Sequence, residues 1–238
     1  MQNFTNKVKS NPNYDYTEKI IFSFFLLLSL SLSTLQAQTV ERKLITRKIS
    51  KADTPKDENN KALRVVLGAG YAHWNGETLD TGNKQLNDFS SGLKPGYNLN
   101  IESEYFFHEY IGVGLDVNYI RHSNKDKKLG INETDNILFW GATCNFRYEN
   151  QKWAFFSGLG LGPVFYSGDA NVNSANTHLN KTTVGLSYNI SGEYRFSRAM
   201  GAGIKLSAAT ASVKIDGTTD RMSLSNLMIT GFISFRTK

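Results

Sequence analysis

Residues 97–121 read YNLNIESEYFFHEYIGVGLDVNYIR, and this stretch determines the fold that the sequence predicts. On both sides of a short turn at 107–110, apolar residues alternate with polar residues or glycine. Successive side chains of a β-strand point to opposite faces of a sheet. The stretch therefore predicts two antiparallel strands joined by a tight turn, with one apolar face and one polar face.

The same alternation continues from Leu63 to the end of the chain. It predicts strands at 63–74, 96–107, 110–121, 136–148, 153–166, 182–196, 199–212 and 225–236. The expected connections alternate between short turns at 107–110, 149–152 and 197–198 and long polar loops at 75–95, 122–135, 167–181 and 213–224. We expect residues 63–238 to form an all-β domain, an eight-stranded antiparallel up-and-down transmembrane β-barrel.

Soluble barrels show the same alternation but point their apolar face inward, so the direction of the faces needs its own argument. Aromatic residues gather near both ends of the apolar face, with Tyr105 and Phe107 at one end and Tyr119 at the other. Two such belts are typical of a barrel that crosses a membrane. The sequence therefore favours an outer-membrane barrel whose apolar face meets lipid.

The polar face, which then lines the interior, carries charges of both signs. Buried charges require partners, and eight strands leave only enough room for side chains. Glycines on neighbouring strands, such as Gly114 beside Glu104, provide that room. We predict a structural ion-pair network in a filled barrel that is not an aqueous pore, made of Arg64, Glu102, Glu104, Asp116, Arg147, Glu193, Arg195, Lys205 and Arg236.

The chain begins with an export pattern. Lys19 precedes an apolar run at 20–33 and the small residue Ala37. The run is shorter than the ~20 residues of a spanning helix. We expect a signal peptide at 1–37, cleaved after Ala37, and a flexible basic periplasmic lead-in at 38–62. An uncleaved membrane anchor is the alternative. The run and the following LQAQ resemble export signals common in Bacteroidota.

Four segments carry a family resemblance: LRVVLGAGYAHW, YNLNIESEYFFHEYIGVGLDVNYI, WAFFSGLGLGPVFY and ITGFISFR. They resemble the outer-membrane β-barrel or "porin family" proteins of Bacteroidota, which are related in architecture to the OmpA transmembrane domain. The resemblance implies insertion by the barrel-assembly machinery, which recognises the last strand, here with Phe232 and Phe235. We expect no peptidoglycan-binding domain of the OmpA type.

Catalysis is the less favoured interpretation. Lipid A deacylases carry a His-x-Ser pair, whereas His122 and Ser123 are adjacent and would point to opposite faces of a strand. His73 has the parity of the lipid face, and His108 and His178 are expected in a turn and a loop. We predict rim and loop histidines, no enzyme, and no cofactor or metal site. Cys144 is the single cysteine, so no intramolecular disulfide is expected.

The charge distribution bears on partners. Half of the net charge of +6 lies in the short lead-in, and no basic face interleaved with aromatics suggests nucleic-acid binding. Lys125, Lys127 and Lys128 form a basic loop that could contact lipopolysaccharide, although an ordinary solvated loop tip is the simpler interpretation. We expect a monomer with periplasmic termini that acts as an envelope structural or surface-loop interaction protein. A lipid-modifying enzyme or a conduit for small apolar molecules is the alternative.

Overall fold

The computed structural model describes residues 62–76, 84–172, 175–214 and 221–237. The chain divides into two units, Met1–Lys56 and Asp57–Lys238, and every described residue belongs to the second. The predicted signal peptide, its cleavage after Ala37 and nearly all of the lead-in lie outside the described residues. No helix within the described ranges is long and apolar enough to cross a membrane.

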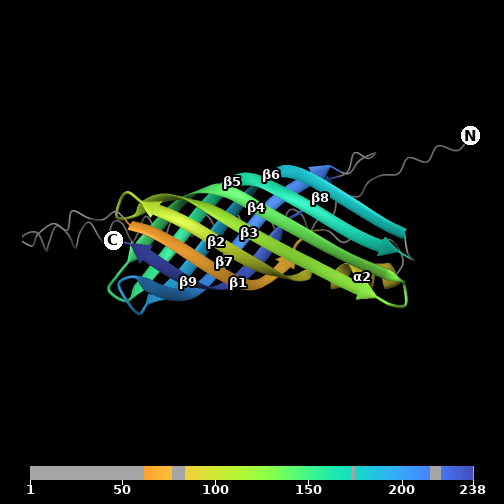
Figure 1. The fold of residues 1–238 in the computed structure, drawn as a ribbon, viewed down its shortest axis with the longest axis horizontal. Coiled ribbons are helices and arrows are strands. Elements are labelled where there is room, and N and C mark those ends of the chain that lie inside the picture. The colour runs from red at the N-terminus through yellow and green to blue at the C-terminus, as the bar shows by residue number, and fades with distance from the viewer. Residues whose placement is uncertain (1–61, 77–83, 173–174, 215–220, 238) are drawn as a thin grey trace, which may run out of the picture. The chain divides into compact units, whose positions relative to one another are not determined.

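Antiparallel strands dominate the described residues (Figure 1). They are β1 Ala62–Trp74, β2 Pro95–Phe106, β3 Ile111–Asp126, β4 Ile131–Glu149, β5 Trp153–Val172, β6 Ala175–Arg195, β7 Met200–Lys214, β8 Arg221–Ser223 and β9 Asn226–Thr237. Their order is β6-β5-β4-β3-β2-β1-β9-β7, and a further β6–β7 pairing closes the ring. The short β8 pairs only with β7 among the described strands. The predicted eight-stranded antiparallel barrel is therefore confirmed.

The two faces of the strands also lie as predicted. On β2, Asn98 is 0% exposed and faces the interior, whereas the neighbouring Leu99 is 49% exposed and faces outward. Exposed apolar side chains continue in this way around the ring, and buried polar ones alternate with them. A soluble barrel with an apolar interior and a charged exterior is inconsistent with this arrangement.

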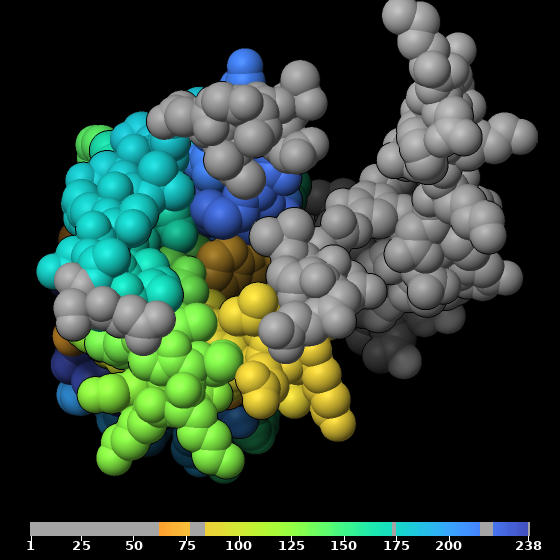
Figure 2. Space-filling model, turned by 90° about the vertical axis from the view of Figure 1, so that its right-hand side faces the viewer, coloured from red at the N-terminus to blue at the C-terminus, as the bar shows by residue number. Residues whose placement is uncertain are grey.

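The barrel has two unlike ends. Short turns join β2 to β3, β4 to β5 and β6 to β7 at what we call the short-turn end. At the opposite hairpin end, the β3–β4 and β5–β6 pairs project beyond the other strands (Figure 1), and α2 Lys84–Gly92 lies beside β3 (Figure 2). Helix α2 is held there by burial of Phe89, whose carbonyl accepts a hydrogen bond from Asn124 Nδ2 at 2.7 Å.

Two of the expected long loops are wrong. Residues 122–135 mostly extend β3 and β4, which stay in register as far as Asp126 and Ile131. Residues 167–181 likewise extend β5 and β6 as far as Val172 and Ala175. The sequence signal failed because both faces of these extensions are largely polar. The ladder of backbone hydrogen bonds continues all the same, since it needs no apolar side chain.

The interior is divided into layers, which the sequence did not predict. Ion pairs occupy the middle and the short-turn end, but an apolar core fills the region toward the hairpin end. This core contains Ala72, Ile120, Ile137, Phe139, Val164, Tyr166, Ala209, Val213, Leu224 and Met228. The prediction of a barrel filled by ion pairs alone is thus incomplete. At the level of this apolar core, the outward faces of the strands are largely apolar as well, so the alternation disappears there.

Close strand contacts predict different effects for two neighbouring glycines. A Cβ at Gly70 would overlap the carbonyl oxygen of Ile229 and lie 2.7 Å from Thr230 Cα, whereas at Gly231 the nearest atom is 3.9 Å away. Backbone atoms of a paired strand cannot move aside cheaply. We expect Gly70→Ala to destabilise the barrel by about 1–3 kcal/mol. Gly231→Ala, the matched control, should leave the urea midpoint in lipid vesicles nearly unchanged; equal effects would contradict this account.

Candidate functional site: the lumen network and the hairpin surface

Arg64 forms the centre of the charge network in the lumen. Its Nη1 donates to Glu104 Oε2 at 2.6 Å, and its Nη2 donates to Glu193 Oε2 at 2.8 Å. The guanidinium carbon lies 3.8 Å from the centre of the Phe156 ring. These are charge-assisted hydrogen bonds and a cation–π contact, which together compensate for loss of water around a buried arginine.

Glu193 connects this centre to the short-turn end. Its second oxygen accepts a 2.7 Å hydrogen bond from Arg236 Nη2. Arg236 Nη1 donates to Glu149 at 2.7 Å, and Glu149 is also 2.9 Å from Arg195 and 3.6 Å from Arg147. Glu149 was missed from sequence because it falls at the start of a predicted turn. The acid is nevertheless the common partner of three arginines.

A second group of polar contacts lies in the middle of the lumen. Lys205 Nζ pairs with Glu102 Oε1 at 2.6 Å and also donates to Asn100 Oδ1. Asn100 Nδ2 in turn donates to Asp116 at 2.7 Å, and Asn118 Nδ2 donates to the same carboxylate. Asp116 therefore meets amides rather than a base. All nine charged residues that the sequence assigned to the interior lie in these two groups.

Glycines provide space for some of these side chains. Glu104 is paired in register with Gly114, and Glu193 with Gly203. A Cβ on Gly201 would overlap the Glu193 carboxylate. Glu102 differs from the expectation, because its partner on β3 is Asp116 and not a glycine. Asp116 accepts amide hydrogen bonds and Glu102 accepts from Lys205, so the two acids are accommodated without glycine between them.

The histidines lie in three different settings. His122 is a buried lumen residue whose Nε2 lies 2.8 Å from Asn226 Oδ1, and the ring packs 5.4 Å from that of Trp74. His178 lies on β6, with Nδ1 2.5 Å from Asp169 Oδ1. The interpretation of both as rim or loop histidines is wrong, for the same reason that the two loops are wrong. His108 lies in the short turn after β2, as predicted.

His122 and Ser123 do point in opposite directions. Ser123 Oγ faces outward and lies 3.1 Å from Thr134 Oγ1, whereas His122 faces the lumen. Within the described part of the chain, no hydrogen bond joins a histidine ring to a serine hydroxyl. The described ranges also contain no group of three or more His, Cys, Asp or Glu that could hold a metal ion.

The outward side of β3–β6 near the hairpin end, which we call the hairpin wall, changes polarity between successive rows. One row consists of Tyr119, Leu138, Phe165 and Thr182, which are paired across the four strands. The next row toward the hairpin tips consists of Arg121, Asn136, Ser167 and Asn180. The boundary between apolar and polar surface therefore crosses the wall between these rows.

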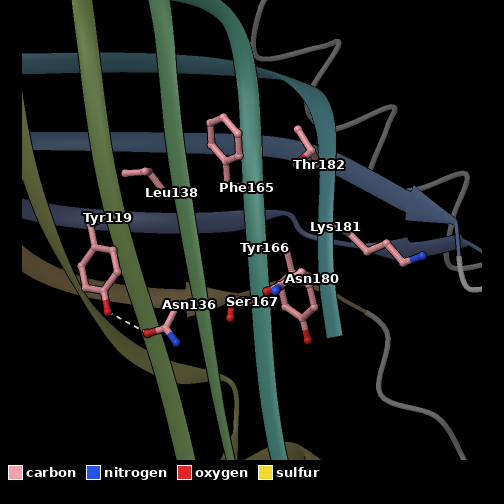
Figure 3. A pocket seen from close by; sticks show the side chains of 9 residues that line it. All are labelled: Tyr119, Asn136, Leu138, Phe165, Tyr166, Ser167, Asn180, Lys181 and Thr182. Atoms are coloured by element: carbon pink, nitrogen blue, oxygen red, sulfur yellow. Dashed lines mark hydrogen bonds between the residues drawn. The ribbon is translucent and has the colours of Figure 1, made fainter. Parts of the chain in front are cut away.

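A depression of about 290 Å³ lies across this boundary (Figure 3). It is lined by Tyr119, Asn136, Leu138, Phe165, Tyr166, Ser167, Asn180, Lys181 and Thr182. The Tyr119 hydroxyl donates to Asn136 Oδ1 at 2.7 Å and joins the two rows. The lysines considered as a possible lipopolysaccharide contact lie farther out: Lys125 is the penultimate residue of β3, and Lys127 and Lys128 lie at the exposed tip.

The sequence matches the family "Outer membrane protein beta-barrel domain" over residues 24–230. The chain belongs to this family. It is accordingly an outer-membrane protein, and the faces of its strands described above are those of a barrel in lipid. The comparison with curated proteins finds no match.

Solved structures of small outer-membrane barrels are similar to this chain at low identity. Ail of Yersinia pestis has 17% identity and a TM-score of 0.47, with 74% of this chain and 98% of Ail covered. OprG of Pseudomonas aeruginosa has 12% identity and a TM-score of 0.49, covering 74% and 96%. The neisserial surface protein NspA has 10% identity and a TM-score of 0.46, covering 74% and 97%.

Glu193 is the most informative lumen residue to change, because it bridges Arg64 and Arg236. Glu193→Gln keeps the shape but leaves two buried guanidinium groups short of a counter-charge. We expect a loss of about 3–5 kcal/mol in the free energy of unfolding, measured by urea titration in lipid vesicles. Glu109→Gln, at an exposed turn, is the control and should cost little. An unchanged midpoint for Glu193→Gln would refute a stabilising role for the network.

Glu133 predicts a pH effect in the β3–β4 extension. Burial, together with the nearby charge of Asp135, raises the pKa of Glu133 from 4.5 to about 7. The folded protein then binds more protons than the unfolded chain between these values, so the free energy of unfolding falls as pH rises from about 4.5 to 7. We expect Glu133→Gln to be more stable than wild type at pH 8 and equal to it at pH 4. A gain that is the same at both pH values would contradict this.

Proposed function

We propose that this outer-membrane barrel is a non-conducting envelope protein that presents its hairpin end outside the cell and keeps both mature termini in the periplasm. The long β3–β4 and β5–β6 hairpins then form a surface for interaction, as long outer connections do in such barrels. The observation that carries the proposal is the filled lumen. Arg64, Glu193 and Lys205 are 2%, 0% and 1% exposed.

The two lumen layers oppose transport in different ways. At the hairpin end, side chains such as Phe139 and Met228 pack in an apolar core that offers ions no substitute for water. Toward the short-turn end and in the middle of the lumen, Glu193 accepts hydrogen bonds from Arg64 and Arg236, and Glu102 accepts one from Lys205, all between strands that are not neighbours. A permeating ion would have to break buried ion pairs. An enzymatic or conduit role has no comparable support among the described residues.

Other parts of the proposal rest on sequence reasoning. Assembly by the barrel-assembly machinery and an origin in Bacteroidota follow from the family resemblance of the strands. Exposed Lys125, Lys127 and Lys128 are proposed to meet lipopolysaccharide phosphates by charge. A monomer is sufficient for each of these roles, because the lumen network is completed within one chain.

The filled lumen predicts that the barrel does not conduct ions. We expect the refolded full chain to give no stable conductance steps in planar bilayers, and lipid A incubated with it to keep its mass. Heat-modifiable gel migration of the same sample shows that the barrel is folded, so an absence of conductance cannot be attributed to a misfolded protein. Stable conductance steps would overturn the non-conducting barrel. Loss of an acyl chain from lipid A would establish the enzymatic alternative.

A further inference from the structure

The depression on the hairpin wall combines an apolar surface and a polar surface at one level of the barrel. On the side toward the middle of the barrel, Leu138 and Phe165 expose apolar surface. On the side toward the hairpin tips, Asn136, Ser167 and Asn180 line it with amides and a hydroxyl. Figure 3 shows these two tiers on neighbouring strands. An occupant that fits must therefore be apolar at one end and rich in hydrogen-bonding groups at the other.

The polar tier has donors and acceptors available. Asn136 uses its amide oxygen for Tyr119, and its amide nitrogen donates no hydrogen bond to another described residue. Asn180 uses its amide nitrogen toward His178, so that its oxygen remains an acceptor. This combination of amide N–H, hydroxyl and amide C=O matches sugar hydroxyls and N-acyl groups, which both donate and accept.

Arg121 adds positive charge to the same row. It is paired in register with both Tyr97 and Asn136, and it is exposed on the outward side of β3. No acid among the described residues forms an ion pair with it. A guanidinium binds phosphate through two parallel N–H donors. With strands about 4.8 Å apart, the row from Arg121 to Asn180 spans about 14 Å, so its ligand must carry phosphate and sugar over that width.

We propose that the hairpin wall docks lipid A, the phosphorylated and acylated disaccharide of the outer leaflet. An acyl chain lies along Leu138 and Phe165, the sugar amides and hydroxyls meet Asn136, Ser167 and Asn180, and a phosphate meets Arg121. A glycerophospholipid has a headgroup too small to reach both ends of the polar row. This proposal rests on the proposed orientation, because only the outer leaflet offers this ligand to the hairpin end.

Native mass spectrometry of the full chain in detergent micelles tests the site. The probes are diphosphoryl lipid A, monophosphoryl lipid A and phosphatidylglycerol. We expect wild type to prefer diphosphoryl lipid A, and Arg121→Ala and Ser167→Phe each to weaken it about tenfold, the effect of losing one charge-assisted contact or the space for the headgroup. Arg121→Ala should also bind the two lipid A forms equally. Arg198→Ala, which removes an exposed arginine at the short-turn end, is the matched control.

Three outcomes overturn the docking site. They are equal affinity of wild type and Arg121→Ala, preference for phosphatidylglycerol, and loss of binding only when Lys125, Lys127 and Lys128 are replaced together. The last would place the contact at the hairpin tip. Gel migration shows that each variant is folded.

Protease treatment of intact cells distinguishes these failures from failure of the orientation. Cleavage in the turn between β4 and β5 from outside the cell would refute the proposed topology. Protection of that turn together with no lipid A preference would refute the docking site alone.

Discussion

The structure depends on one constraint: a closed ring of eight strands leaves room for side chains but not for water around each charge. Arg64 shows how the constraint is met. Its guanidinium lies between Glu104 and Glu193 and against Phe156, so its three partners come from three different strands. These contacts join β1 to its neighbour β2 and, across the bore, to β5 and β6. The same side chains that fill the lumen therefore also tie strands that are distant around the ring.

The layering of the interior follows from this constraint and from the unlike ends of the barrel. Charged side chains lie at the short-turn end and in the middle, where arginines from β1, β4, β6 and β9 converge on Glu149 and Glu193. Toward the hairpin end no such group of cations is present among the described residues, and the lumen is filled mainly by aliphatic and aromatic side chains, with buried His122, Asp135 and Asn226 beside them. A core of this kind needs no counter-charges, so it can sit beneath the polar extensions without a second ion network.

The alternation of residues predicted the strands and which side chains share a face, because successive side chains of a strand point to opposite faces. The aromatic belts at both ends of the apolar face, and not the alternation itself, predicted that this face points outward. The alternation did not predict the extensions of β3 to β6, because segments such as 122–126 are polar on both faces. Backbone hydrogen bonds between strands do not depend on the side chains, so the composition of these segments does not reveal them. Glu149 and His122 were misjudged for a related reason. A shift of one position in register decides whether a residue at a strand end lies in a turn or in the lumen. Register is set by pairing with the neighbouring strand, so it cannot be read from the segment alone.

Register also explains why the hairpin wall is invisible in the sequence. Arg121, Asn136, Ser167 and Asn180 lie far apart along the chain, in three segments that alternation assigned to strand ends or loops. Antiparallel pairing brings them to one level, and the row beneath them is the last apolar one. Because outward polar side chains are costly in hydrocarbon, that change of row marks where lipid ends on this side of the barrel. A filled barrel can bind ligands only on its exterior, and this boundary is where its exterior offers both apolar and polar contacts to one molecule.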